Sequence, residues 1–128
     1  MKFLSTTLFA LIAFSCAAQP MEDRDALVEI TEAIALNLSE GEFEKVRETF
    51  DANMKNALAA AQLEQVWDGL VAQAGAYSET GTVTSKVLGG YRTIYQILKF
   101  EKTPVKLKVV FGDTKEVIGL FLIPVNAE

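Results

Sequence analysis

The sequence contains no histidine and a single cysteine, Cys16, which lies close to its start. A chain with this composition cannot build a disulfide within itself, a zinc site of cysteine and histidine ligands, a Ser-His-Asp triad or a Cys-His dyad. Its paired glycines, Gly89 and Gly90, stand between two β-rich runs and match no phosphate-binding motif. The sequence therefore predicts neither a metal site nor a cofactor.

Basic residues are too few for a general nucleic-acid-binding protein, because 12 lysines and arginines stand against 17 acidic residues, a formal net charge of −5. The charges are unevenly distributed. Residues 21–68 hold twelve acidic and four basic residues, whereas residues 69–128 hold five acidic and seven basic ones. The second half would attract an acidic partner, and segregated solvated faces are the alternative explanation of the same pattern.

Residues 1–18 have the features of an export signal: a basic start at Lys2, a short apolar run over residues 8–14, and small residues after it. The run is too short to cross a bilayer as a permanent helix. Residues 13–16, Ala-Phe-Ser-Cys, resemble a bacterial lipobox, in which the cysteine becomes the lipidated first residue. Ordinary signal-peptidase cleavage near residue 17 or 18 is the alternative. We expect an exported protein with its domain over residues 22–128, either a lipoprotein anchored to the membrane through Cys16 or a periplasmic or secreted protein.

Three helices are predicted in the first half of this domain. In the first, over residues 22–38, apolar residues at positions 27, 30, 34 and 38 form one stripe, and acidic residues in the first turn suit the helix dipole. Gly41 is suited to end this helix, and Ser39 with Glu42 has capping-box spacing for the next one.

The second and third helices follow directly. The second covers residues 43–58 and bends near Asp51. The third, over residues 62–74, is the most regular, and Gly75 ends it. Its apolar stripe comprises Leu63, Val66, Trp67, Leu70, Val71 and Ala74.

Residues 82–125 predict a four-stranded antiparallel meander. Its first hairpin turns at Gly89 and Gly90, a two-residue loop that fixes the register so that Thr84 faces Tyr95. Because side chains alternate along a strand, one face of this sheet is apolar and forms the core. Its members are Ile94, Leu98, Phe100, Val105, Leu107, Val109, Phe111, Ile118, Leu120 and Leu122. Three helical stripes must be buried on this face, which predicts an α+β fold with its helices first and its sheet second.

The opposite face of the sheet mixes apolar and basic residues. Its predicted ligand or partner surface consists of Tyr91, Tyr95, Ile97, Phe121 and Ile123. Lysines at positions 86, 99, 106 and 108 share this face. An apolar patch rimmed by charge often marks a binding surface. The alternative is an ordinary solvated face whose lysines discourage edge pairing with other chains.

A family resemblance runs through core and turn positions. It is carried by residues 36–51 with their Gly-Glu-Phe turn, Leu63, Trp67, Leu70, Gly75, Tyr91, and residues 117–124 with Gly119. This pattern resembles a bacterial exported domain of unknown function in the nuclear-transport-factor-2-like (cystatin-like) superfamily, the type also found ahead of α/β-hydrolase domains. The resemblance implies a cone of three N-terminal helices packed on a curved four-stranded antiparallel sheet, often with an apolar pocket inside and often dimeric through the sheet. It implies no activity and no catalytic residues, because this fold carries enzymes as well as binding modules.

Two functions from different classes remain. The first, which we favour, is an exported cell-envelope binding or interaction module without catalytic activity. It would bind a small apolar ligand in the cone or an envelope protein on the sheet, and a homodimer through Tyr95, Phe121 and Ile123 is one form of the latter.

The alternative is a small isomerase or hydrolase-like enzyme that uses a pocket carboxylate together with a tyrosine. The candidate groups are Glu64, Asp68, Tyr77, Tyr91 and Tyr95. Both carboxylates lie off the apolar stripe of their helix, and a tyrosine pair on one strand face is typical of packing. The enzyme needs a carboxylate that points into an enclosed cavity, so a core filled by Trp67, Phe50 and Phe100 would exclude it.

Overall fold

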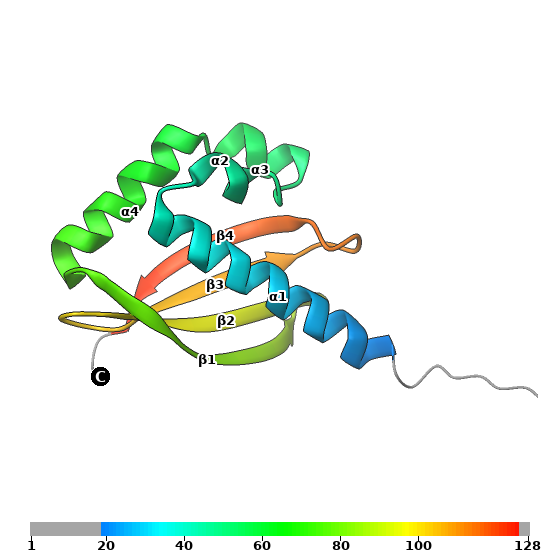
Figure 1. The fold of residues 1–128 in the computed structure, drawn as a ribbon. Coiled ribbons are helices and arrows are strands. Elements are labelled where there is room, and N and C mark those ends of the chain that lie inside the picture. Colours follow the sequence, from blue (N-terminus) through cyan, green and yellow to red (C-terminus); the bar gives the residue numbers. More distant parts are fainter. Residues whose placement is uncertain (1–18, 126–128) are drawn as a thin grey trace, which may run out of the picture.

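The computed structural model describes residues 19–125, in which four helices precede four strands. The helices are α1 (Gln19–Glu40), α2 (Phe43–Arg47), α3 (Ala52–Ala57) and α4 (Ala60–Ala74), and the strands are β1 (Tyr77–Leu88), β2 (Tyr91–Phe100), β3 (Val105–Phe111) and β4 (Val117–Pro124). The strands form one open antiparallel sheet in the order β1-β2-β3-β4, and the helices lie on one face of it (Figure 1). The predicted α+β class and antiparallel meander are therefore confirmed.

The first hairpin has the predicted register. Leu88 pairs with Tyr91, and Thr84 pairs with Tyr95. Gly89 and Gly90 have φ values of 58° and 85°, which residues with a Cβ rarely adopt, so the glycine pair is what permits this two-residue turn.

Strand β1 is longer than the predicted run over residues 82–88, because it begins at Tyr77, directly after the turn that ends α4. Its pairing with β2 contains two register irregularities, one between Tyr77 and Glu79 and one between Thr80 and Val83. Gly81 lies at the second, where an added Cβ would come within 3.3 Å of the Ile97 Cβ. Such irregularities interrupt the alternation of side chains, so hydrophobic periodicity does not reveal this part of the strand.

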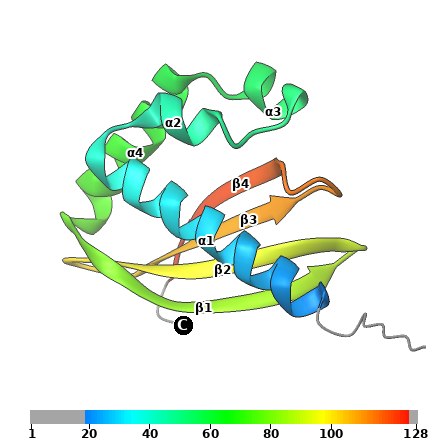
Figure 2. The same cartoon turned by 45° about the vertical axis from the view of Figure 1, so that its right-hand side comes forward.

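The core lies between the helices and the inner face of the sheet. Helix α1 contributes Leu27, Ile34, Ala35 and Leu38, and the sheet contributes Ile94, Leu98, Phe100, Val105, Leu107, Val109 and Phe111. Trp67 of α4 packs against Tyr77 and Phe100 with ring centroids 6.0 and 5.4 Å apart. In Figure 2, α1 lies above β1 and β2, while α2 and α3 lie toward β4, so the helices together cover the inner face.

The second predicted helix, over residues 43–58 with a bend near Asp51, is two separate helices, α2 and α3. The chain leaves the helical conformation at Phe50, which forms a parallel bridge with Val117 of β4. The Asp51 N–H donates to the Val117 carbonyl at 3.0 Å, and the Val117 N–H donates to the Thr49 carbonyl at 2.8 Å. Asp51 then starts α3, because its side chain accepts a hydrogen bond from the Met54 N–H at 2.8 Å. Residues 19–125 therefore contain four helices in place of the three predicted.

The turn before α2 is also different from the one predicted. Gly41 ends α1 with φ +80°, as expected. The capping box is wrong, because the Ser39 hydroxyl donates to the Leu36 carbonyl at 2.7 Å, and Glu42 precedes α2 without a side-chain cap. Ser39 is thus part of the last turn of α1 and is too early to cap the next helix.

Two predicted core positions are corrected. Ile118 was expected in the core, but a register irregularity between Val110 and Phe111 pairs Phe111 with Val117, so Val117 is buried and Ile118 is not. On α4, Val66 is 48% exposed, whereas Trp67 is buried. The inward stripe of this helix therefore leaves out Val66 and is narrower than the sequence suggested.

The predicted export signal over residues 1–18 and its lipidation site, Cys16, lie outside the described residues. Within residues 19–125, no helix combines the length and the apolar composition needed to cross a membrane.

Candidate functional site

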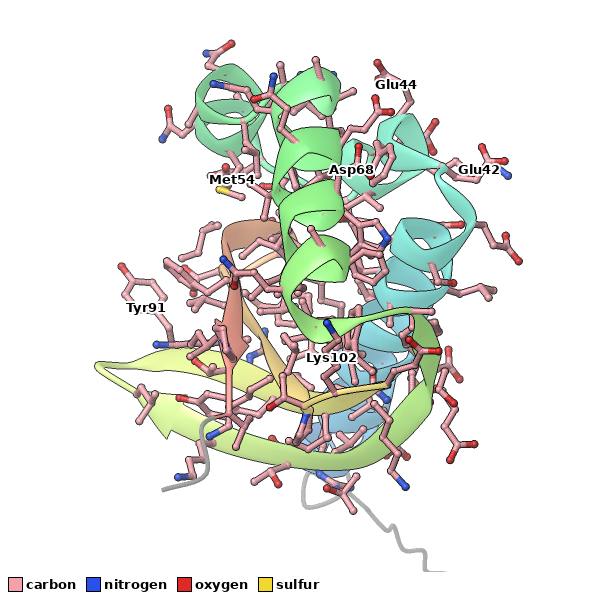
Figure 3. The ribbon with its side chains drawn as sticks, turned by 90° about the vertical axis from the view of Figure 1, so that its left-hand side faces the viewer. Glu42, Glu44, Met54, Asp68, Tyr91 and Lys102 are labelled. Atoms are coloured by element: carbon pink, nitrogen blue, oxygen red, sulfur yellow. The ribbon has the colours of Figure 1, made fainter. Side chains whose placement is uncertain are left out.

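The candidate site is the face of the sheet that points away from the helices, called here the outer sheet face. It carries all five predicted surface residues: Tyr91, Tyr95, Ile97, Phe121 and Ile123. Tyr91 and Phe121 are each 49% exposed and Ile123 is 43% exposed, while Tyr95 and Ile97 are half-buried. Figure 3 shows Tyr91 projecting from the sheet on the side of the molecule opposite Glu42 and Glu44 of the helical layer. The structure therefore brings these five side chains together on one surface.

The strand register determines which side chains of this surface are neighbours on adjacent strands. Tyr95 and Ile97 belong to β2, Lys106 and Lys108 to β3, and Phe121 and Ile123 to β4. Lys108 pairs with both Tyr95 and Phe121, and Lys106 pairs with both Ile97 and Ile123. Each lysine therefore stands between two apolar neighbours on adjacent strands. The aliphatic stem of a lysine covers apolar surface while its ammonium group stays in water, so the apolar side chains are partly shielded and the face remains hydrated.

Three of the lysines on this face lie around the ring of Tyr95. The ammonium nitrogens of Lys86, Lys106 and Lys108 lie 5.7, 5.3 and 5.9 Å from the centroid of its ring. Lys108 also lies 5.3 Å from the centroid of the Phe121 ring. Such distances allow cation–π attraction, which is worth roughly 0.5–1 kcal/mol at an exposed site. Tyr95 therefore has three lysine ammonium groups near its ring, whereas Phe121 has one.

A hollow of about 300 Å³ opens beside this ring. Its lining comprises Thr82, Thr84, Lys86, Tyr95, Ile97 and Lys106. The sequence reasoning placed Thr84 opposite Tyr95 but did not name either threonine as part of a site. The signal was available for Thr84 from the hairpin register, whereas Thr82 lies within the irregularity between Thr80 and Val83, which the sequence pattern did not show.

The lysines of the outer sheet face differ in their partners. Lys99 forms an ion pair with Glu79 at 3.6 Å, near the start of β1. Within residues 19–125, no carboxylate forms an ion pair with Lys86, Lys106 or Lys108. The centre of this face is therefore positively charged although the whole chain carries a net charge of −5.

The groups of the enzyme hypothesis are not assembled. Glu64 and Asp68 are exposed on α4, while Tyr91 and Tyr95 lie on the outer sheet face, with the core between the two sets. Glu64 lines a shallow, open hollow of about 450 Å³ next to Glu42 and Glu44 on the outside of the helical layer. The positions proposed for catalysis thus lie on opposite sides of the molecule.

Tyr77, the fifth enzyme candidate, is part of the core packing. Its ring lies edge-on to Phe100, with centroids 5.6 Å apart. Burial, and to a smaller extent the negative charge of Glu79, raises the pKa of the Tyr77 hydroxyl above 10.0. A tyrosine with a raised pKa holds its proton more firmly, which does not favour its use as a base.

The space inside the fold is occupied by side chains. Phe50, Trp67 and Phe100 are 3%, 6% and 7% exposed and belong to one continuous apolar cluster. This is the filled core that counts against a catalytic cavity. In the part of the chain that the structure describes, no group of three or more acidic, cysteine or histidine side chains is placed to hold a metal ion.

Comparison with known proteins gives one match. A family model described as "Protein of unknown function (DUF3887)" matches residues 31–120. No curated protein and no solved structure matches the chain. The matched residues extend from the interior of α1 to the middle of β4, so they include every residue that lines the hollow beside Tyr95.

Proposed function

The chain belongs to the family described as "Protein of unknown function (DUF3887)", and on that premise, which supplies no activity, we propose that it is an exported interaction module without catalytic activity. In this proposal a protein of the cell envelope binds to the outer sheet face. The observation that carries the proposal is the exposure of Tyr91, Phe121 and Ile123 beside lysines that have no ion-pair partner among the described residues. Exposed apolar side chains within a charged surround are typical of binding surfaces.

We assign the domain to the nuclear-transport-factor-2-like superfamily as part of the same proposal. Its support is the order of elements, with every described helix before the sheet and on one face of it. In this superfamily the helices and a curved sheet form a cone. Since Phe50, Trp67 and Phe100 fill the space between these layers, the proposal places the partner on the sheet and not inside the cone.

The charge of the face favours an acidic partner over a second copy of the chain. Two copies that met through their outer sheet faces would bring Lys86, Lys106 and Lys108 of one toward the same lysines of the other. Like charges in a closed interface are costly, whereas a partner with carboxylates would neutralise them. A homodimer through Tyr95, Phe121 and Ile123 is therefore an outcome to be tested and not the form we favour.

Photo-crosslinking in cells tests the partner directly. The full chain would carry a photo-reactive phenylalanine at Phe121 or Ile123, and a matched variant would carry it at Val66, which is 48% exposed on the helical side. We expect a discrete adduct from both sheet positions, absent from the Val66 variant, whose partner is then identified by mass spectrometry. Adducts shared by all three positions, or none from the sheet, would refute the proposal. An adduct of twice the chain mass would identify a homodimer.

A single charge provides a second test on the same surface. Phe121→Glu places a carboxylate among the exposed apolar side chains of the outer sheet face, so we expect the adduct formed from Ile123 to disappear. Because Phe121 is about half-buried, the loss of its ring should lower the free energy of unfolding by about 1–2 kcal/mol, which a typical domain tolerates. Loss of the adduct together with unfolding would be uninformative, so denaturant unfolding of the same variant is measured in parallel.

Export and anchoring form the other part of the proposal. Intact mass and membrane fractionation of the wild type and of Cys16→Ala, expressed in a bacterial host, distinguish its two forms. A mature chain that begins at a diacylated Cys16 and sits in the membrane fraction, lost on mutation, would support the lipoprotein. A soluble chain that begins near residue 18 in both variants would support ordinary cleavage, and retention of the whole leader would refute export.

A further inference from the structure

We propose that the hollow beside Tyr95 is a binding site for a small organic oxyanion, a carboxylate or phosphate group attached to a short apolar body. The inference goes beyond the protein partner proposed above, because it concerns a small molecule that the isolated domain would bind. It rests on the convergence of three ammonium groups on one ring, with nitrogens 5.3–5.9 Å from the ring centroid.

The charge arrangement is the first step of the argument. Lys86 approaches the ring from β1, while Lys106 and Lys108 approach it from β3, so cations from two strands lie 5.3–5.9 Å from one ring centroid. Lys86 and Lys106 also line the hollow, whereas Lys108 lies beside it. The ring offsets only part of their mutual repulsion. Since no described carboxylate forms an ion pair with them, the group that would complete this arrangement is an anion from outside the chain.

The lining of the hollow supplies the other contacts that such a ligand needs. The exposed hydroxyls of Thr82 and Thr84 have no hydrogen-bond partner within residues 19–125, so both are available to an oxyanion. Tyr95 and Ile97 form an apolar wall against which a ring or short chain can lie. The volume, about 300 Å³, is at the lower end of the range of small-molecule sites. The lining therefore fits a compact ligand with one charged end.

Lys99 shows that the arrangement is not general to the lysines of this face. Its ammonium group is paired with Glu79 at 3.6 Å and lies outside the hollow. This lysine therefore serves as the matched control, since it has the same side chain on the same sheet face but has an internal counter-ion.

The proposal is tested by nuclear magnetic resonance on the full mature chain. The backbone amide signals of residues 19–125 are followed as a probe is added. The probes are benzoate, phenyl phosphate and benzyl alcohol, which share a ring and differ in charge. We expect saturable shifts around Thr84, Tyr95 and Ile97 with benzoate and phenyl phosphate, with dissociation constants on the order of 1 mM, and no saturable binding of benzyl alcohol. Added salt should weaken the binding of both anions.

Lysine variants identify the groups responsible. Lys86→Gln and Lys106→Gln should each weaken benzoate binding about fivefold, whereas Lys99→Gln should leave it unchanged. Equal binding of benzyl alcohol, equal weakening by Lys99→Gln, or shifts that never saturate would overturn the proposal. The test is independent of the protein partner, because it uses the purified chain with small probes alone. Benzoate binding can therefore fail while the crosslinked adduct persists, and the adduct can fail while benzoate still binds.

Discussion

Gly75, the residue that ends α4 and turns the chain into β1, gives the sharpest prediction about stability. Its φ is +91° and its ψ is −170°, a conformation essentially restricted to glycine that costs a residue with a Cβ about 1–3 kcal/mol. An added Cβ would also lie 2.7 Å from the Cβ and 2.9 Å from the Oε1 of Glu101, which are closer than real contacts allow. Gly75→Ala therefore requires a movement of Glu101 as well as backbone strain.

The cost of that movement follows from the hydrogen bonds at this corner. The Ala76 N–H donates to Glu101 Oε1 at 3.2 Å, and the Glu101 N–H donates to the Ala76 carbonyl at 3.0 Å. Losing one such bond costs about 1 kcal/mol. Together with the backbone term, Gly75→Ala should lower the free energy of unfolding by about 3 kcal/mol, a large share of the 5–15 kcal/mol of a typical domain.

The assay is denaturant unfolding followed by the fluorescence of Trp67, the single tryptophan of the chain. Gly41→Ala is the matched control, because Gly41 has φ +80° but no atom within 4 Å of an added Cβ, so only the backbone cost of about 1 kcal/mol applies. The double variant Gly75→Ala with Glu101→Gly should recover part of the loss. Equal losses for Gly75→Ala and Gly41→Ala would refute the role of the collision with Glu101.

Three further predictions concern single side chains. Gln96 is 1% exposed on the inner sheet face, and no group within residues 19–125 donates a hydrogen bond to its Oε1, so Gln96→Met should raise the free energy of unfolding by about 1 kcal/mol. A loss of stability measured in the same denaturation assay would show that the amide is needed. Asp51 caps α3 through the Met54 N–H, so Asp51→Ala should cost about 1 kcal/mol while Asp51→Asn retains most of the stability, and equal effects of the two would exclude capping. The raised pKa of Tyr77 means that the folded state holds the phenolic proton more firmly than the unfolded state, in which the pKa is 10.0. The contribution of this proton to stability is therefore fully present below about pH 10 and is lost as the pH rises through the folded pKa. Tyr77→Phe should remove this part of the decline, as measured by unfolding at pH values of about 8, 10 and 11.

The parts of the fold that the sequence predicted are those with local signals. The hairpin at Gly89 and Gly90 and the helix end at Gly41 follow from backbone conformations that glycine permits. Alternation along β2 and β3 was sufficient to separate the core face from the outer face, which placed Tyr95 on a surface with its lysines.

The parts that were missed depend on contacts between distant residues. The break at Phe50 arises from pairing with Val117, and nothing in the residues around position 50 indicates a partner so far along the chain. The irregularity between Val110 and Phe111 buries Val117 in place of Ile118, although both residues are apolar. The hollow beside Tyr95 was missed for the same reason, because its lining combines residues from β1, β2 and β3.

The bridge between Phe50 and Val117 also sets an order of assembly. These residues are more than half of the chain apart, so the segment between α2 and α3 obtains its backbone partners only after the last strand has been synthesised. Contacts of such long range slow folding, because the intervening chain must be ordered first. A chain shortened before residue 117 would therefore leave the residues between α2 and α3 without their backbone partners in β4.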